Sequence, residues 1–366
     1  MDFKNYLVPG KTGLLIGIGG VSMSPLAEVL HDAGLDIRGS DMAESSNTLT
    51  LRERGIPIHI GHSADNVTDD ISFVIRTAAV HDDNPEVHEA HRRGIPVFER
   101  TQAWGALMRG YQNALCISGT HGKTTTTSMC THIMMAAEKD PTVMIGGTLP
   151  LLKACHRVGK GNTIIMESCE YYNSFLALNP TIAVVLNIEA DHLDFFKDLE
   201  DIKHSFRCFA ERVPAETGTV IANYDDANTM DALRGIARKV ITFGLNAKAD
   251  VYAQNIVHRG SVSEFDIYHR GNYFARVTLH VPGIHNVRNA LAATAAAIVL
   301  GVSPNAVKYG LAGFEGAGRR FDFKGKFQGA DLYDDYAHHP SELRALLDAV
   351  DTLNYQRTIV VFQPHT

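Results

Sequence analysis

The sequence predicts an α/β fold in which buried parallel strands alternate with helices and a small antiparallel sheet follows. Three observations support this prediction. Apolar runs such as Ala114–Ser118 and Ile182–Leu186 are continuous rather than alternating, as in parallel strands covered on both faces. Two such runs, Thr12–Ile18 and Ala114–Ser118, lead through glycine-rich turns into helix-like segments. Between residues 250 and 281 the pattern changes to short alternating runs, which are typical of antiparallel hairpins.

Residues 1–110 predict a Rossmann-like domain. The strand Thr12–Ile18 is followed by a glycine turn, the helix Ser24–Ala33 and the strand Leu35–Gly39. This layout is typical of a dinucleotide-binding fold, although Ser22 occupies the third glycine position of the usual fingerprint. Asp41 follows the second strand, where an acidic residue commonly binds a ribose hydroxyl; an ordinary turn aspartate is the alternative. Further expected elements are a strand at 71–78, a helix at 85–93, a strand at 96–98 and a helix at 103–108.

The most informative segment is a phosphate-binding loop, Gly119-Thr120-His121-Gly122-Lys123-Thr124-Thr125, which lies between an apolar strand and the helix-like segment Ser128–Ala137. Glycines let backbone N–H groups approach an anion, and a helix N-terminus adds positive potential. Lys123 would neutralise the outer phosphates, and the Thr124 hydroxyl would reach a Mg²⁺ ion. The common nucleoside-triphosphatase pattern requires glycine where this chain has Ile117, so the loop is of a shorter kind. A glycine turn with a solvated lysine is the alternative.

Two polar segments follow strands of the predicted central domain, residues 111–318. Glu167 ends the strand that begins at Thr163, and the segment Asn187–His192 follows the strand Ile182–Leu186. Because ligand sites of parallel sheets gather at the carboxyl ends of strands, both segments should open onto the same edge as the phosphate loop. Glu167 with Thr124 is then a natural Mg²⁺ site, and His192 is an unusual but feasible ligand of a second ion. A surface acid and a strand-end histidine are the alternatives. Strands at 219–222 and 240–243 complete the expected parallel sheet.

An alanine-rich helix, Asn286–Leu300, closes the central domain. His285, Asn286 and Asn289 lie at its start, where their side chains could hydrogen-bond an adenine edge or simply cap the helix. The arginine pair that follows, Arg319 and Arg320, suits a transferring phosphoryl group, with a solvated basic pair as the alternative.

Residues 319–366 predict the start of a second Rossmann-like domain, with a strand at 331–333, a helix at 341–350 and a strand at 358–362. Acids and histidines cluster at 334–339, and their spacing favours substrate and phosphate contacts over a zinc site. An independent α/β domain needs about 100 to 150 residues, so we expect the chain to stop inside this one.

Composition excludes several classes of protein. The net charge of −7 provides no basic field for nucleic acid. Five cysteines, without a C-x-x-C pair, fit reduced thiols better than a disulfide framework or a zinc site. The first ten residues lack the apolar core of a signal peptide, and the apolar run 290–302 is too short to span a bilayer. These features predict a cytoplasmic protein without a membrane partner.

Together these motifs resemble the Mur ligase family along essentially the whole chain, and within it the branch that adds L-alanine. The segments that match are Gly17-Ile18-Gly19-Gly20 with Met23-Ser24, the loop 119–127, Glu167, Asn187–His192, His285-Asn286-x-x-Asn289, Arg319-Arg320-Phe321 and Asp335-Tyr336-x-His338-His339-Pro340. His121 is discriminating, because in this resemblance only the alanine-adding and tripeptide-recycling branches carry T-H-G-K-T-T. The start of the chain favours the alanine-adding branch. Arg76 departs from the family, since it lies where a serine-rich turn is usual.

The resemblance implies a set of site residues. ATP would be bound by Gly119, Thr120, His121, Gly122, Lys123, Thr124, Thr125, His285, Asn286 and Asn289, the UDP-sugar by Gly19, Gly20, Ser22, Met23, Ser24 and Asp41, and the amino acid by Tyr336 and His338. Lys123, Glu167, His192 and Arg320 would be catalytic, with Mg²⁺ on Thr124, Glu167 and His192.

The implied activity is ATP-dependent ligation in peptidoglycan precursor synthesis. The carboxylate of UDP-N-acetylmuramate would attack the γ-phosphate of ATP, and the amine of L-alanine would attack the resulting acyl phosphate, leaving ADP and phosphate. A monomer or weak dimer is expected. Three alternatives stay open at this point: a tripeptide-recycling ligase, a fragment that binds UDP-sugar and ATP without ligating them, and an NAD(P)-dependent oxidoreductase built on the Gly17 turn.

Overall fold

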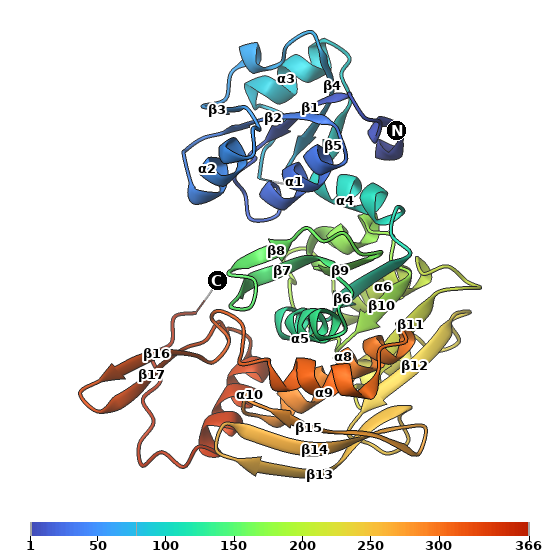
Figure 1. Cartoon of the computed structure of the whole chain (residues 1–366), viewed down its shortest axis with the longest axis vertical. Coiled ribbons are helices and arrows are strands. Elements are labelled where there is room, and N and C mark those ends of the chain that lie inside the picture. The colour runs from blue at the N-terminus through green and yellow to red at the C-terminus, as the bar shows by residue number, and fades with distance from the viewer. Residues whose placement is uncertain (1, 78, 365–366) are drawn as a thin grey trace. The chain divides into compact units, whose positions relative to one another are not determined.

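The computed structural model describes residues 2–77 and 79–364. Within them the chain forms two compact units, one reaching to Tyr111 and including Ala177–Asn179, the other comprising Gln112–Leu176 and the residues from Pro180 onward (Figure 1). In the described ranges, no helix is both long enough and apolar enough to cross a bilayer.

The first unit is built on a five-stranded parallel sheet with strand order β3-β2-β1-β4-β5. Its strands are β1 (Thr12–Ile16), β2 (Asp36–Asp41), β3 (Ile58–Ile60), β4 (Ile71–Arg76) and β5 (Val97–Glu99), and its α-helices are α1 (Ser24–Asp32), α2 (Ser46–Glu53), α3 (Pro85–Arg92) and α4 (Arg100–Met108). Short 3₁₀ helices lie at Phe3–Tyr6 and Ala64–Asn66. The central strand β1 is buried along its whole length: strands pair with it on both sides, and its side chains pack into the core on the faces of the sheet. The predicted Rossmann-like sheet is confirmed. The helix α2 was not predicted, since only Thr48 and Leu51 of its residues are buried and it shows little apolar periodicity.

The second unit is built on a ten-stranded sheet with strand order β15-β14-β13-β12-β11-β10-β6-β9-β7-β8. The parallel strands are β6 (Asn113–Ser118), β7 (Thr142–Leu149), β9 (Thr163–Glu167), β10 (Ile182–Val185), β11 (Thr219–Asn223) and β12 (Lys239–Gly244), while β8 (Ala154–Arg157) runs antiparallel to β7. The predicted antiparallel strands are β13 (Val251–Arg259), β14 (Val262–His269) and β15 (Asn272–Leu279). They extend the same sheet, because β13 also pairs in parallel with β12.

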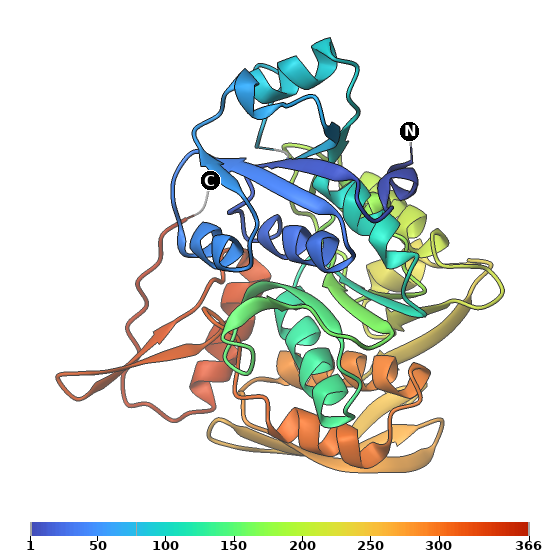
Figure 2. The ribbon, with the colours of Figure 1, turned by 45° about the horizontal axis from the view of Figure 1, so that its top comes forward.

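Three helices cover the core of the second unit: α5 (Lys123–Ala136), α8 (Ile284–Val299) and α9 (Pro304–Ala312), and α5 contacts both of the others (Figures 1 and 2). The helices α6 (Leu199–Glu211) and α7 (Ala227–Ala232) and the 3₁₀ segment Tyr171–Ala177 lie along the other connections. The prediction that α5 begins at Ser128 is wrong by five residues. Threonine is a poor helix former, but here Thr124–Thr127 are buried, and Thr127 Oγ1 donates a hydrogen bond to the carbonyl of Lys123.

The C-terminal segment packs within the second unit. It contains a hairpin, β16 (Asp322–Phe327) with β17 (Ala330–Asp334), and the helix α10 (Pro340–Asp351). The strand predicted at 358–362 is wrong, because these residues form no regular element and their apolar side chains are exposed. A strand is stabilised by backbone hydrogen bonds to a neighbouring strand, and among the described residues this segment has no such neighbour.

Candidate functional site

The phosphate loop connects the end of β6 to the start of α5, as predicted. Gly119 and Gly122 have φ angles of 146° and 83°, values that residues with a side chain rarely adopt. There is also no room for side chains, because a Cβ atom on Gly119 would lie 2.8 Å from Leu186 Cβ and one on Gly122 would lie 2.6 Å from Asn289 Oδ1. The two glycines are therefore required both by the backbone conformation and by close packing.

Asn187, which follows β10, fastens this loop. Its Oδ1 accepts a hydrogen bond from the backbone N–H of His121 at 2.8 Å, and its Nδ2 donates to the His121 carbonyl at 3.1 Å. The backbone N–H of Thr120 donates to the Asn187 carbonyl, and the Thr120 hydroxyl accepts from the N–H of Glu189. Sequence reasoning placed Asn187 in a motif but gave it no role.

Lys123 is the first residue of α5, and its ammonium group is fully engaged. Nζ donates to the carbonyls of Gly119 and Thr120, at 2.6 and 3.0 Å, and lies 3.0 and 3.1 Å from the carboxylate oxygens of Glu170. Burial by itself lowers the pKa of Lys123, but the adjacent carboxylate of Glu170 outweighs burial and raises it. The lysine is thus held protonated. Glu170 was missed as a functional residue, although it is the second acid of the segment 166–170.

Glu167 and Thr124 lie together, as the sequence predicts. The Thr124 hydroxyl donates to Glu167 Oε1 at 3.1 Å, and Glu167 Oε2 accepts from the backbone N–H of Gly146 at 2.6 Å. The strands β10, β6 and β9 are parallel neighbours, so the segments after them share one edge of the sheet. The predicted convergence on that edge is confirmed.

His192 belongs to the same edge, after β10, but the structure does not join it to this pair. Its ring stacks on Tyr171 with centroids 4.2 Å apart, and its φ of 52° lies in the left-handed region. Among the described residues, no hydrogen bond, ion pair or ring contact links His192 to Thr124 or Glu167.

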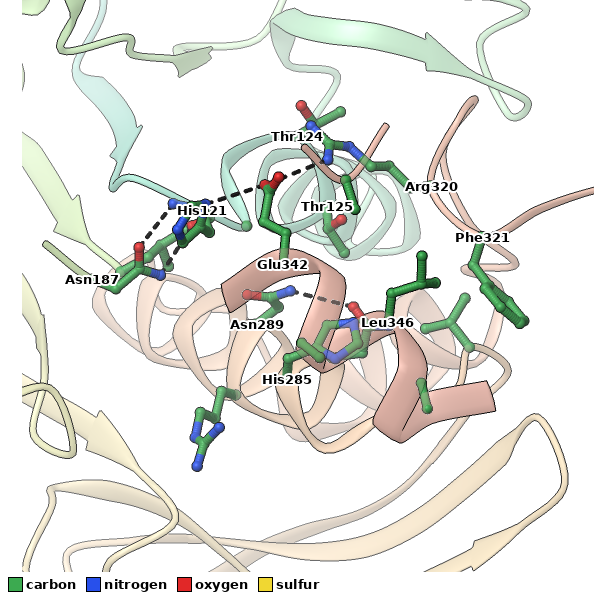
Figure 3. Close-up of a pocket in the computed structure, with 18 of the residues that line it drawn as sticks. His121, Thr124, Thr125, Asn187, His285, Asn289, Arg320, Phe321, Glu342 and Leu346 are labelled. Carbon is green, nitrogen blue, oxygen red and sulfur yellow. Dashed lines mark hydrogen bonds and ion pairs between the residues drawn. The ribbon is translucent and has the colours of Figure 1, made fainter. Parts of the chain in front are cut away.

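A cavity of about 430 Å³ lies next to the loop (Figure 3). Its walls come from the loop, from the ends of β11 and β12, from the first turns of α8 and from α10, and include His121, Thr124, Thr125, Asn223, Asp225, His285, Asn286 and Asn289. Burial, helped by the charge of Arg288, lowers the pKa of His285 to about 4, so its ring is neutral at pH 7. Asn289 Nδ2 donates to Asn286 Oδ1, and Asn286 Nδ2 donates to the carbonyl of Pro282. The predicted adenine segment therefore lines a cavity that also contacts the phosphate loop.

The start of α10 faces the same cavity and brings Glu342 to the loop. Glu342 Oε1 lies 3.1 Å from His121 Nδ1 and 3.8 Å from Arg320 Nη1 (Figure 3). Burial raises the pKa of Glu342, but the hydrogen bond from His121 and the nearby positive charge outweigh it and lower the pKa to about 2. Glu342 was not predicted, and no local pattern in the sequence indicates its partner.

Tyr336, His338 and Arg320 are also brought together. The guanidinium groups of Arg319 and Arg320 lie 4.7 and 5.4 Å from the centre of the Tyr336 ring. The ring of His338 packs edge-on against the same tyrosine, and His338 Nδ1 lies 2.9 Å from the Tyr336 carbonyl oxygen.

In the first unit, Gly19 and Asp41 meet at the carboxyl end of the sheet. Asp41 Oδ2 accepts a hydrogen bond from the Gly19 N–H at 2.8 Å, and a Cβ on Gly19 would lie 2.8 Å from Thr48 Cγ2. Gly20 lies in the same turn, where its N–H donates to the Gly17 carbonyl.

The remaining residues predicted to bind the UDP-sugar lie just beyond this turn. The Ser22 hydroxyl accepts from Arg100, and the Ser22 carbonyl accepts from Trp104 Nε1. The side chains of Met23 and Ser24 are buried. Sequence reasoning did not anticipate that burial.

Comparison with known proteins identifies the family. The Mur ligase middle domain matches residues 117–297, the catalytic domain of the Mur ligase family matches 15–112, and the glutamate ligase domain of Mur ligases matches 319–366. The UDP-N-acetylmuramate–L-alanine ligase of Agathobacter rectalis is 46% identical over 352 residues, which are 96% of this chain and 76% of that protein. This chain belongs to the Mur ligase family.

Solved structures of Mur ligases agree with the fold. The UDP-N-acetylmuramate-alanine ligase MurC from Thermotoga maritima superimposes with a TM-score of 0.78 at 31% identity, covering 93% of this chain and 78% of that one. The UDP-N-acetylmuramate:L-alanyl-gamma-D-glutamyl-meso-diaminopimelate ligase from Neisseria meningitides gives a TM-score of 0.75 at 26% identity, covering 84% of this chain and 99% of that one. The predicted family and α/β fold are confirmed, whereas the division into domains 1–110, 111–318 and 319–366 and the roles of single residues stay predictions.

Proposed function

We propose that this Mur ligase joins L-alanine to UDP-N-acetylmuramate at the expense of ATP, through an acyl phosphate, and releases ADP and phosphate. The observation that carries the proposal is the phosphate loop, with a carboxylate and a hydroxyl beside it, opening on a cavity lined by a neutral histidine and two amides. Alanine is favoured over a tripeptide, because an alanine-adding relative is 46% identical and because, among solved structures, the alanine ligase is 31% identical and the tripeptide ligase 26%.

ATP is required because a carboxylate is a poor acylating group, whereas phosphate is a good leaving group. In this proposal the loop residues and Lys123 hold the phosphates, and Arg320 neutralises charge that develops during phosphoryl transfer. Lys123 would exchange its ion pair with Glu170 for the phosphate oxygens. His285, Asn286 and Asn289 would hydrogen-bond the adenine edge.

The donor set fits Mg²⁺, since Thr124 Oγ1 and Glu167 Oε1 are hard oxygen atoms only 3.1 Å apart. Bound there, Mg²⁺ would neutralise charge on the phosphate oxygens. His192 is proposed as the ligand of a second ion.

Binding of the other substrates is proposed for residues in both units. Tyr336 and His338 would contact the amino acid. Gly19, Gly20, Ser22 and Asp41 would contact the UDP-sugar. Because the side chains of Met23 and Ser24 are buried, these two residues would contribute backbone groups at the start of α1. We further propose that the protein acts in the cytoplasm, because its proposed substrates are soluble nucleotides and an amino acid, and that it is a monomer or weak dimer.

One assay tests the proposal. The protein is incubated with ATP, Mg²⁺, UDP-N-acetylmuramate and each amino acid in turn, and ADP and product are followed by mass spectrometry. Turnover with L-alanine is expected. Nucleotide binding without any product would contradict ligation and favour a binding fragment.

Lys123→Ala tests the phosphate loop within this reaction. We expect acyl-phosphate formation, measured by positional isotope exchange in ATP, to fall by about 10³-fold or more, because the positive charge that neutralises the γ-phosphate is removed. Lys308→Ala, an exposed lysine on α9, is the matched control and should leave the exchange unchanged. Undiminished exchange in Lys123→Ala would remove the proposed role.

A further inference from the structure

Three possible metal ligands from separate segments converge beside the phosphate loop. His121 Nε2, Glu189 Oε2 and His339 Nδ1 come from the loop, from the segment after β10 and from the residue before α10. One ligand atom from each residue lies within 4.8 Å of the other two, and Glu189 Oε2 is 3.4 Å from His121 Nε2 and 3.5 Å from His339 Nδ1. In a tetrahedral site with metal–ligand bonds of about 2.0–2.1 Å, neighbouring ligand atoms are about 3.3–3.4 Å apart. The observed spacing therefore suits a single ion.

The outer nitrogen of each histidine has a hydrogen-bond acceptor that fixes the tautomer. His121 Nδ1 lies 3.1 Å from Glu342 Oε1, and a carboxylate oxygen can only accept a hydrogen bond, so Nδ1 carries a hydrogen. His339 Nε2 lies 3.2 Å from the Ala190 carbonyl oxygen, which can only accept, so Nε2 carries the hydrogen there. The backbone N–H of Ser341 also donates a long hydrogen bond, 3.4 Å, to His339 Nδ1. A ring nitrogen can accept such a bond only when it carries no hydrogen. In the neutral form of each ring, the inner nitrogen therefore presents its lone pair toward Glu189.

This arrangement places three electron-rich atoms around one point. The Ser341 hydroxyl lies between the two nitrogens, 2.9 Å from His121 Nε2 and 2.7 Å from His339 Nδ1, and it has one hydrogen to give. With both rings neutral, this one hydrogen cannot satisfy two imidazole lone pairs and a carboxylate, and a bound cation would supply the missing positive charge. Histidines whose outer nitrogens donate to a carboxylate or a backbone carbonyl are the usual form of metal ligands.

We propose that His121, Glu189 and His339 bind a transition-metal ion of the Zn²⁺ kind. Two imidazole nitrogens and one carboxylate oxygen suit Zn²⁺, whereas Mg²⁺ prefers oxygen ligands, so this site is separate from the Thr124–Glu167 pair. The proposal goes beyond the ligase reaction, which does not require such an ion.

The ion has a route to the site and a structural consequence. The side chains of His121, Glu189 and His339 are 15%, 36% and 21% exposed, so an ion can enter from solvent. Once bound, it links the phosphate loop to the residue that caps α10. It therefore fastens the C-terminal segment over the nucleotide cavity.

Metal titration tests the site. The full chain is treated with chelator, and Co²⁺ or Zn²⁺ is added without nucleotide or Mg²⁺. We expect one Co²⁺ per chain with the visible absorption of tetrahedral coordination, and displacement by Zn²⁺. His339→Gln and Glu189→Gln should each weaken binding by about 100-fold or more, and Glu342→Gln, which replaces the charged acceptor of His121 Nδ1 by a neutral amide, by about 10- to 100-fold.

Two controls separate this site from its surroundings. His338→Gln changes the adjacent histidine, which is outside the cluster, and Glu167→Gln removes the proposed Mg²⁺ ligand; both should bind Co²⁺ as the unmodified protein does. Loss of binding in Glu167→Gln alone would place the ion at the Mg²⁺ pair and overturn the proposal. Because the Co²⁺ titration needs no ATP, it is independent of whether the ligase reaction occurs.

Folding of the variants is checked by far-ultraviolet circular dichroism without metal. Zn²⁺ should raise the melting temperature of the unmodified protein but not of His339→Gln or Glu189→Gln. The proposal fails if the unmodified protein takes up no Co²⁺ at tenfold excess, or if both ligand variants take it up unchanged.

Discussion

The ion pair between Lys123 and Glu170 gives the most direct test of how the phosphate loop is held. Their charged atoms are 3.0 Å apart, and the side chains are 15% and 3% exposed. Removing one partner of a buried pair costs about 3–5 kcal/mol, because the other charge is left uncompensated. In Glu170→Gln the lysine keeps two carbonyl acceptors, so we expect a smaller cost of about 2–3 kcal/mol. In Lys123→Met the carboxylate loses its only side-chain donor among the described residues, so we expect about 3–5 kcal/mol.

The double variant removes both charges and should cost about 2–3 kcal/mol, well below the sum of the single costs. The coupling energy between the two positions should therefore be at least about 2 kcal/mol. Urea unfolding without nucleotide, followed by far-ultraviolet circular dichroism, measures these costs. With a slope of about 3 kcal/mol/M, Glu170→Gln should shift the midpoint of the second unit by about 1 M.

The single tryptophan provides an internal control for this experiment. Trp104 belongs to the first unit, so the transition seen by its fluorescence should keep its midpoint in all three variants. If the single costs add to within about 0.5 kcal/mol of the double cost, the two charges do not stabilise each other and the reasoning is wrong.

Three further changes have outcomes that the structure fixes. Gly122→Ala combines a φ of 83° with a 2.6 Å approach to Asn289 and should cost about 2–4 kcal/mol in urea unfolding, whereas Gly271→Ala, with a φ of 79° and no neighbour within 4 Å, should cost only about 1–2 kcal/mol. Burial lowers the pKa of His132 from 6.5 to about 4, so the unfolded chain binds more protons between these pH values, and this group should lower stability by about 3 kcal/mol as pH drops through that window. His285 has a similarly lowered pKa, so in a pH series of unfolding midpoints His132→Gln should remove only the share of the fall that is due to His132. Gly310→Ala would place a Cβ 2.5 Å from the backbone of α5 and should lower the melting temperature at a cost of about 1–3 kcal/mol.

The sequence by itself determined the features that depend on neighbouring residues. Continuous apolar runs indicated parallel strands, and a strand, two glycines and a helix start indicated the phosphate loop, because φ angles and helix starts are set within a few residues. The convergence of Glu167 with Thr124 also followed, since the carboxyl ends of adjacent parallel strands share one edge.

Only the tertiary structure decided which side chains meet. The pairs Lys123–Glu170 and His121–Asn187 join residues 47 and 66 positions apart, and His121–Ser341 joins residues 220 apart, so no local pattern could reveal them. The same reason explains two wrong boundaries: burial holds the threonines of α5 in a helix against their propensity, and residues 358–362 find no strand to pair with. The phosphate loop could be predicted from the sequence because its backbone conformation depends on neighbouring residues. The side chains that contact the loop could not be predicted, because packing and charge across the fold determine them.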